Sequence, residues 1–136
     1  MSGLVVSSAL LHRMITHCNS VYPQEACGIL SGKGRVAQRI HEMTNTEQSS
    51  FSYLMDPAEQ FRVMKELRKE NLEMVAIYHS HPGSLPYPSS KDIALASYPD
   101  SVYVIVGLSD RAEPEIRAFE ISENVVKEVV ISTADA

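Results

Sequence analysis

Two nearly continuous apolar runs dominate the pattern of hydrophobic and polar positions along the chain. They are the strand MVAIYHSHP at residues 74–82, which is apolar until His79, and SVYVIVGL at residues 101–108. Runs of this length that are apolar at successive positions are typical of strands buried on both faces of a sheet. Residues 25–43 (EACGILSGKGRVAQRIHEM) predict two further strands, joined by a turn at residues 31–34 where Gly-Lys-Gly supplies positive φ angles.

Three segments have the spacing or the end signals of helices. The first starts at a serine cap, residue 7 or 8, and ends before Pro23. The second has Asp56 as N-cap and Pro57 at its first helical position. The third starts at residue 89 or 90 and ends near Pro99. The first two are defined by apolar positions at helical spacing, namely Leu10, Leu11, Met14, Ile15 and Cys18, and then Phe61, Met64 and Leu67.

The remaining segments complete one layered domain. A short strand is expected at residues 4–6, and residues 115–121 and 125–131 are expected to form a closing antiparallel pair. The order β-α-β-β-α-β-α-β-β-β predicts a mixed β-sheet flanked by helices, an α/β (α+β layered) fold in one domain over residues 1–136. Residues 44–53 (TNTEQSSFSY) are polar and aperiodic, and are the best candidate for a mobile loop.

The composition limits which classes of partner and which cellular compartment are expected. The chain has 136 residues and a net charge of -5, without a run of lysine or arginine, which argues against nucleic acid or a membrane surface as partner. Its two cysteines, Cys18 and Cys27, form no CxxC pair. The first residues lack the basic and apolar regions of a signal peptide. We therefore expect a soluble, cytoplasmic protein with reduced thiols.

The stretch HSHPGSLPYPSSKD at residues 79–92 contains the candidate chemistry. On a strand, His79 and His81 face one side while Ser80 points away. Two converging imidazoles make half of a catalytic zinc site, and Asp92 is a plausible third ligand. The alternative is structural: two surface histidines, and a helix start in which Ser89 and Asp92 form a capping box. Asp92 would then have to choose between the cap and the metal.

These residues fit the pattern H-x-H-P, six residues, S-x-x-D, and here the chain resembles the JAMM or MPN-plus zinc metallopeptidases. Glu25 in PQEACGILSG matches the glutamate of that family's motif. The resemblance implies the family's cytidine-deaminase-like fold. It also implies that Zn²⁺ is held by His79, His81 and Asp92, that Glu25 moves the proton of the attacking water, and that Ser89 stabilises the oxyanion. Residues alone do not connect Glu25 with His79, because 54 positions separate them.

The resemblance also implies a substrate class. Members of the family cleave after ubiquitin and ubiquitin-like proteins, whose tails commonly end in Gly-Gly. The compact chain resembles short prokaryotic members, which favours trimming of an adduct such as carrier-cysteine from a ubiquitin-like sulfur carrier. The alternatives are a deconjugating isopeptidase and, in another class, a non-catalytic scaffold. A zinc nucleoside deaminase would need H-x-E and P-C-x-x-C, and neither is present.

The sequence leaves open the roles of four further residues and the oligomeric state. Cys27 lies two positions after Glu25 and either faces the site or is a small buried hydrophobe. Phe51, Tyr53 and Tyr87 either line a groove for the substrate tail or pack their loops down. Exposed edge strands leave a homodimer open.

Overall fold

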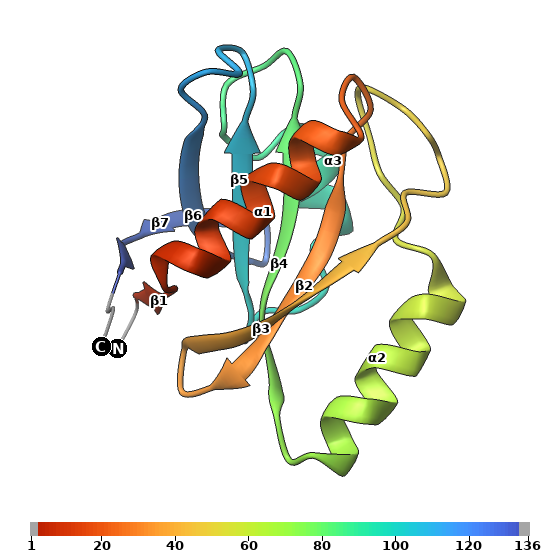
Figure 1. The fold of residues 1–136 in the computed structure, drawn as a ribbon, viewed down its shortest axis with the longest axis vertical. Coiled ribbons are helices and arrows are strands. Elements are labelled where there is room, and N and C mark those ends of the chain that lie inside the picture. The colour runs from red at the N-terminus through yellow and green to blue at the C-terminus, as the bar shows by residue number, and fades with distance from the viewer. Residues whose placement is uncertain (1–2, 134–136) are drawn as a thin grey trace.

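A computed structural model describes residues 3–133 and contains one eight-stranded sheet with three helices (Figure 1). The predicted domain of residues 1–136 includes residues 1–2 and 134–136, which lie outside the described residues. The elements are β1 Leu4–Val5, α1 Ser8–Ser20, β2 Cys27–Lys33, β3 Val36–Met43, α2 Pro57–Lys69, β4 Glu73–His81, α3 Ser90–Leu95, β5 Val102–Gly107, β6 Glu115–Ser122, β7 Val125–Val129 and β8 Ile131–Ser132.

The sheet is mixed, and its centre is formed by the strands with the longest apolar runs. The strand order is β7-β6-β5-β4-β2-β3-β1-β8. β4 pairs in parallel with β5 and antiparallel with β2. Both central strands β4 and β5 are buried along almost their whole length, as expected when helices cover both faces. The predicted mixed sheet flanked by helices is confirmed.

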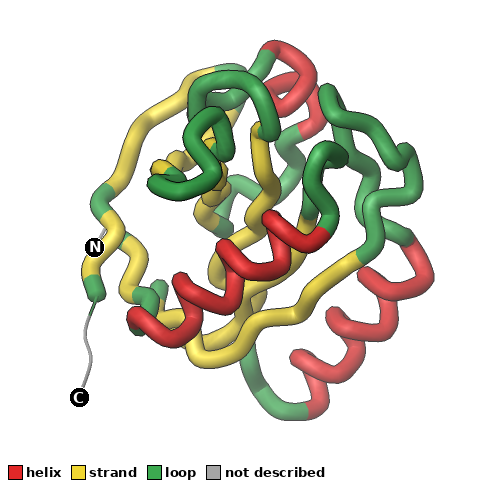
Figure 2. The backbone as a smooth tube through the Cα atoms, turned by 45° about the horizontal axis from the view of Figure 1, so that its top comes forward, coloured by secondary structure: helices red, strands yellow, loops and turns green. Residues whose placement is uncertain are grey.

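The two faces of the sheet carry separate apolar clusters. α1 packs Met14 and Cys18 against one face, where Tyr78 of β4 is also buried. α2 and α3 cover the other face, through Val63 and Ile93 among others. Figure 1 shows α1 in front of the sheet and α3 behind it, and Figure 2 shows the same layers from a second direction. Side chains of alternate residues of β4 therefore enter two different layers.

The helix starts follow the local signals in the sequence. The side chain of Ser7 caps α1, and that of Asp56 caps α2 with Pro57 at the first turn. Ser89 caps α3. No helix among residues 3–133 is long and apolar enough to cross a membrane.

The turn of the β2–β3 hairpin lies later than predicted. Positive φ angles occur at Gly34 and Arg35, at 59° and 66°, the pair of left-handed residues that a two-residue hairpin turn requires. Gly32 lies instead within β2, where an added Cβ would be 1.9 Å from the carbonyl oxygen of Val36. Gly32 therefore provides room for the neighbouring strand, and Gly34 provides the turn.

The predicted closing strand at residues 125–131 is wrong in one respect, because it is two strands. β7 ends at Val129 and pairs with β6, whereas β8 pairs with β1 at the opposite end of the strand order. Only Val130 separates β7 from β8, and its carbonyl oxygen accepts a 2.9 Å hydrogen bond from Leu4 N–H. The sheet curls so that its two ends meet at this residue.

The predicted apolar stripe of α2 is also wrong at its first position. Leu67 is buried, but Phe61 is 71% exposed. Each residue advances a helix by about 100°, so residues six apart differ by about 120° in direction. Phe61 therefore points away from the face that holds Leu67 against the sheet.

Candidate active site

Three predicted ligand residues meet where β4 ends and α3 begins. His79 and His81 are among the last three residues of β4, and their side chains point to the face of the sheet that α2 and α3 cover. Asp92 lies in the first turn of α3. The two Nε2 atoms lie 3.1 Å apart, and Asp92 Oδ2 lies 3.2 Å from His79 Nε2 and 3.1 Å from His81 Nε2. The three side chains form a group that can hold a metal ion.

The separations fit an ion at the centre of this group. Ligands of a tetrahedral ion with bonds of about 2.0 Å are roughly 3.3 Å apart, close to the distances between the two Nε2 atoms and Oδ2. His81 Nδ1 is 2.8 Å from the carbonyl oxygen of Leu85 and donates to it, which leaves the lone pair of Nε2 facing the group. The ring of Tyr53 stacks on His79 at 4.6 Å between centroids.

Burial and close pairing shift the titration of all three groups. Burial lowers the pKa of His79. Burial also acts against the charged forms of His81 and Asp92, but the hydrogen bonds of Asp92 with both histidines, and that of His81 with the carbonyl oxygen of Leu85, outweigh it. The pKa of His81 is therefore raised and that of Asp92 is held well below its usual range. Asp92 is a carboxylate at neutral pH, as a metal ligand must be.

Asp92 is positioned for both of the roles that the sequence set against each other. Its Oδ2 atom accepts a 2.9 Å hydrogen bond from Ser89 N–H, and its own N–H donates to Ser89 Oγ at 3.0 Å. This is a complete capping box. The same Oδ2 faces both histidines, so the cap fixes the carboxylate in the direction of the site. The capping box is therefore compatible with the predicted metal-ligand role of Asp92.

Strand pairing brings Glu25 to the histidines. β2 and β4 are antiparallel with Cys27 opposite His79, so the same register extended by two residues places Glu25 opposite His81. Residues directly opposite each other share a face of the sheet. Glu25 is 4% exposed, and the structure therefore joins it to residues more than fifty positions away.

The residue between the two histidines holds the segment that carries Glu25. Ser80 points to the opposite face, as predicted, and its Oγ accepts a 2.8 Å hydrogen bond from Ala26 N–H. The backbone N–H of Ser80 donates to the carbonyl oxygen of Ala26 at 3.1 Å. Ser80 is fully buried. One residue thus clamps the backbone next to Glu25 with two hydrogen bonds.

The carboxyl group of Glu25 is poised for proton transfer. Burial raises its pKa from 4.5 to about 7; His81 and Lys91 oppose the rise, while Asp92 and Glu47 add to it. Among the described residues, Glu25 Oε1 has no hydrogen-bond partner although it is buried, and the same is true of His79 Nδ1. A buried carboxyl group with a pKa near neutrality and a free oxygen atom is suited to act as a general base.

The loop at residues 44–53, predicted to be mobile, is tied to Glu25. Asn45 is buried, and its Nδ2 donates to the carbonyl oxygens of Glu25 and Ser52 at 3.0 and 3.1 Å. Glu25 N–H donates in turn to the carbonyl oxygen of Ser49 at 2.8 Å. Asn45 Oδ1 accepts from the N–H groups of Glu47 and Leu54 at 3.0 Å. The loop is held by an amide whose donors and acceptor are all used.

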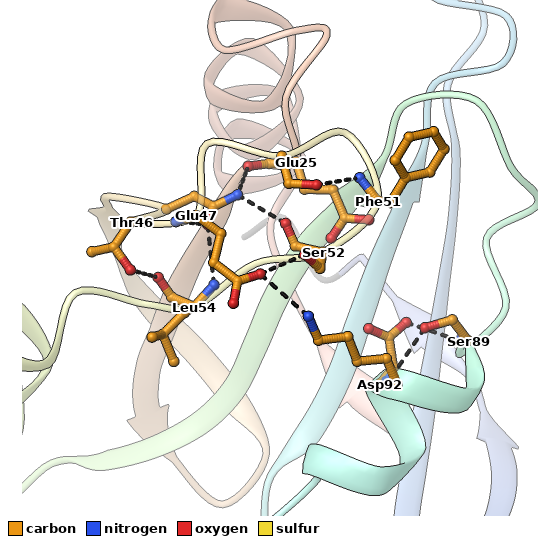
Figure 3. Close-up of polar contacts among 11 residues, drawn as sticks. Glu25, Thr46, Glu47, Phe51, Ser52, Leu54, Ser89 and Asp92 are labelled. Atoms are coloured by element: carbon orange, nitrogen blue, oxygen red, sulfur yellow. Dashed lines mark hydrogen bonds and ion pairs between the residues drawn. The ribbon is translucent and has the colours of Figure 1, made fainter.

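The same loop reaches across to α3. Glu47 Oε1 accepts from Lys91 Nζ at 3.3 Å and from the hydroxyl of Ser52. Figure 3 shows Glu47 and Ser52 of the loop facing Asp92 and Ser89 of α3. The ion pair between Glu47 and Lys91 therefore links the segment that holds Glu25 to the helix that carries Asp92.

Ser89 lies at the N-terminus of α3 beside Asp92. Its Oγ accepts from Asp92 N–H, and a hydroxyl that accepts one hydrogen bond keeps its hydrogen for another partner. Ser89 is therefore able to donate a hydrogen bond while it caps the helix.

The other open residues fall into two groups. Cys27 is opposite His79 on the same face and is fully buried, yet it is not part of the group of His79, His81 and Asp92. Tyr53 packs on His79, whereas Tyr87 packs edge-on against Phe119 at 5.3 Å. The side chain of Phe51 is 87% exposed.

Sequence reasoning missed Ser80 and Asn45 as residues that organise the site. Ser80 was noticed only as pointing away from the histidines. A serine at a fully buried strand position signals a hydrogen bond, because buried hydroxyls need partners. No comparable signal marked Asn45, since its partners lie in a different segment and in its own loop.

Comparison with known proteins places the chain in a family. Residues 7–122 match the family described as prokaryotic homologs of the JAB domain. A CysO-cysteine peptidase of Mycobacterium tuberculosis is 35% identical over 134 residues, covering 97% of this chain and 92% of the relative. A desampylase of Pyrococcus furiosus is 34% identical over 108 residues, covering 79% of this chain and 74% of the relative.

Solved structures agree with this assignment. The solution structure of a protein from Desulfitobacterium hafniense matches with a TM-score of 0.89 and 31% identity, covering 98% of this chain and 94% of that one. A JAB1/MPN domain protein from Archaeoglobus fulgidus has the same fold, with a TM-score of 0.65 and 18% identity over 99% of this chain and 100% of that one. The expected fold and the resemblance to the JAMM/MPN family are confirmed, and the chain belongs to the family of prokaryotic homologs of the JAB domain.

Proposed function

We propose that this chain is a zinc peptidase that hydrolyses the bond after the C-terminal Gly-Gly of a ubiquitin-like sulfur carrier and so releases a single attached amino acid such as cysteine. The arrangement that carries the proposal is the buried Glu25 carboxyl group opposite His81, beside the converging His79, His81 and Asp92. A buried carboxyl group with a pKa raised to about 7, next to this group, favours a catalyst over a scaffold.

His79, His81 and Asp92 would hold the zinc ion. Two imidazole nitrogens and one carboxylate oxygen are a typical ligand set for catalytic zinc, with a fourth position left open. Zinc bound there supplies a Lewis acid that makes water a nucleophile near neutral pH. Tyr53, stacked on His79, and the carbonyl oxygen of Leu85, bonded to His81, keep the two imidazoles in place.

Glu25 transfers the proton in this reaction, and Ser89 stabilises the negative charge that develops. Glu25 takes a proton from the attacking water and returns it to the leaving nitrogen. Ser89 donates its hydroxyl hydrogen to the oxyanion that develops on the glycine carbonyl. Removal of one such donor typically costs about 10²–10³-fold in turnover, and a general base contributes about 10²–10⁴-fold.

The choice of substrate follows the relatives. The M. tuberculosis relative is named a CysO-cysteine peptidase and matches nearly the whole chain, which supports trimming of a carrier-cysteine adduct. The desampylase of P. furiosus supports a second candidate, an isopeptidase that cleaves protein conjugates, although it matches a smaller share of the chain. Cys18 and Cys27 are free and buried, which supports a reducing compartment such as the cytoplasm.

The test uses zinc-loaded protein and two substrates. A ubiquitin-like carrier ending in Gly-Gly-Cys and a Gly-Gly carrier isopeptide-linked to a lysine side chain are incubated with the enzyme, and the products are read by intact mass. We expect loss of the terminal cysteine. Faster cleavage of the lysine conjugate would instead establish the isopeptidase, and cleavage of neither by a zinc-containing sample would overturn both proposals.

Two variants assign the chemistry. Glu25→Gln should bind one zinc ion per chain, as measured by elemental analysis, while cleavage falls by at least about 10²-fold. Glu66→Gln, an exposed glutamate on α2, should cleave like the wild type. Undiminished turnover of Glu25→Gln would show that another group moves the proton.

A further inference from the structure

Lys91 is a cation held directly beside the candidate metal group. It precedes Asp92 in the first turn of α3, and its Nζ lies 3.3 Å from Glu47 Oε1 on the opposite loop. Both Lys91 and Asp92 line a cavity of about 220 Å³ bounded by Tyr53 and Ser52 on the loop side. Lys91 is the one cationic side chain among the described residues that line this cavity.

The other charges at this place are negative. Glu25, Glu47 and Asp92 all bear carboxyl groups, and the charges of Lys91 and Glu47 both act on Glu25. Apart from a bound metal ion, a substrate carboxylate entering this region meets these acidic side chains, and a cationic side chain would offset their repulsion. Lys91 supplies that cation at a side chain that is half exposed and so reachable from solvent.

The amino acid that the proposed reaction releases already carries an α-carboxylate next to the bond that is cleaved. Hydrolysis breaks the C–N bond between the terminal glycine carbonyl and the nitrogen of the attached amino acid. Water supplies the oxygen of the new glycine carboxylate, and Glu25 transfers a hydrogen of that water to the departing nitrogen. When the attached group is a single C-terminal amino acid, only its Cα atom separates this nitrogen from the α-carboxylate. A cation that recognises it must therefore lie close to Glu25, as Lys91 does.

Resting on the proposed function, we propose that Lys91 binds the α-carboxylate of the departing amino acid and thereby selects a single C-terminal residue over an isopeptide-linked lysine side chain. The ε-amine of a conjugated lysine has no carboxylate at that place. An ammonium group carries three donors, so Lys91 can contact the carboxylate and Glu47 together. The exposed ion pair with Glu47 is weak and therefore costs little to rearrange when Lys91 binds the carboxylate.

The experiment compares two carriers that differ only in charge at the C-terminus. One ends in Gly-Gly-Cys as the free acid and the other as the C-terminal amide, and both are cleaved by zinc-loaded wild type, Lys91→Met and Lys91→Arg. Wild type should favour the acid by roughly tenfold in kcat/KM, the ratio expected for one hydrogen bond to a charged group. Lys91→Met should bring the ratio close to one, mainly through KM for the acid, and Lys91→Arg should restore most of it.

Lys65→Met provides the matched control, because Lys65 is exposed on α2 and does not line the cavity. Its acid-to-amide ratio should equal that of the wild type. Equal cleavage of acid and amide by the wild type, or an unchanged ratio in Lys91→Met, would overturn the role of Lys91 and leave the proposed function intact. Cleavage of neither carrier by zinc-containing wild type would overturn the proposed function and this inference with it.

Discussion

The backbone N–H of Ala26 donates a 2.8 Å hydrogen bond to Oγ of Ser80. Ser80 separates the two histidines of the candidate metal group, and Ala26 follows Glu25, so this bond joins the two halves of the site through the far face of the sheet. The bond is completely buried, where an unpaired N–H would be costly. It fixes the start of β2 against the end of β4.

Ser80→Ala should misplace Glu25 without removing the ligands. The unpaired Ala26 N–H should cost about 1–3 kcal/mol of stability, and kcat should fall roughly tenfold or more because small errors in position are expensive in catalysis. Zinc content and KM should stay close to the wild type, as measured by elemental analysis and steady-state kinetics.

Ser101→Ala controls for lost stability alone. Ser101 is a buried serine whose Oγ donates to the carbonyl oxygen of Met74 at 2.8 Å, at the start of β5. It should lose stability and keep its kcat at a temperature where both variants are folded. Equal kcat values for Ser80→Ala and the wild type would show that the clamp does not position Glu25.

Ser89→Ala should lose catalysis and a helix cap together. We expect a fall of about 10²–10³-fold in kcat from the missing oxyanion donor and about 1 kcal/mol of stability from the missing cap of α3. Ser7→Ala removes the cap of α1 and should show the second effect without the first. Steady-state kinetics and urea denaturation measure the two effects, and a kcat within twofold of the wild type would refute the role of the hydroxyl.

The contribution of Glu25 to the stability of the metal-free protein should fall as the pH rises from 4.5 to 7. Burial raises the pKa of Glu25 from 4.5 to about 7, so the folded state holds this proton more tightly than the unfolded state does. Its contribution is complete below pH 4.5 and is lost as the pH rises through 7, a change of about 3 kcal/mol. Glu25→Gln cannot titrate at this position.

Urea denaturation with a chelator present measures this effect as the difference between wild type and Glu25→Gln at each pH. Taking the difference cancels the titration of groups that do not interact with Glu25, whereas His81 and Asp92 interact with it and contribute to the difference. The free energy of unfolding of the wild type should decline relative to the variant between pH 4.5 and 7. A difference that does not change with pH would mean that Glu25 ionises normally in the fold.

Gly28→Ala should destabilise the sheet where it faces Tyr78. A Cβ at Gly28 would lie 2.2 Å from the ring of Tyr78, which is fully buried and contacts His17 Nδ1 through its hydroxyl at 2.6 Å. Such overpacking costs about 1–3 kcal/mol. Gly83→Ala, with open space around it, should be close to neutral in thermal denaturation, and equal melting temperatures for the two variants would contradict this account.

Local chemistry by itself determined most elements of this protein. The caps at Ser7, Asp56 and Ser89 act over three or four residues, so their helix starts were readable from the sequence. The period of two in a strand likewise set His79 and His81 on one side and Ser80 on the other. The candidate metal group was readable because a capping box, also local, returns Asp92 to the end of β4.

Tertiary structure decided the rest, because the interactions concerned join distant segments. Antiparallel pairing of β2 with β4 placed Glu25 opposite His81, and only the resemblance to a family had singled out this glutamate. The last predicted strand is divided into β7 and β8, because its first part pairs with β6 and its last part pairs with β1 at the other end of the strand order. Packing against the sheet left Phe61 exposed. Local propensity fixes an element, whereas the partner of each element depends on contacts that form only when the whole chain is folded.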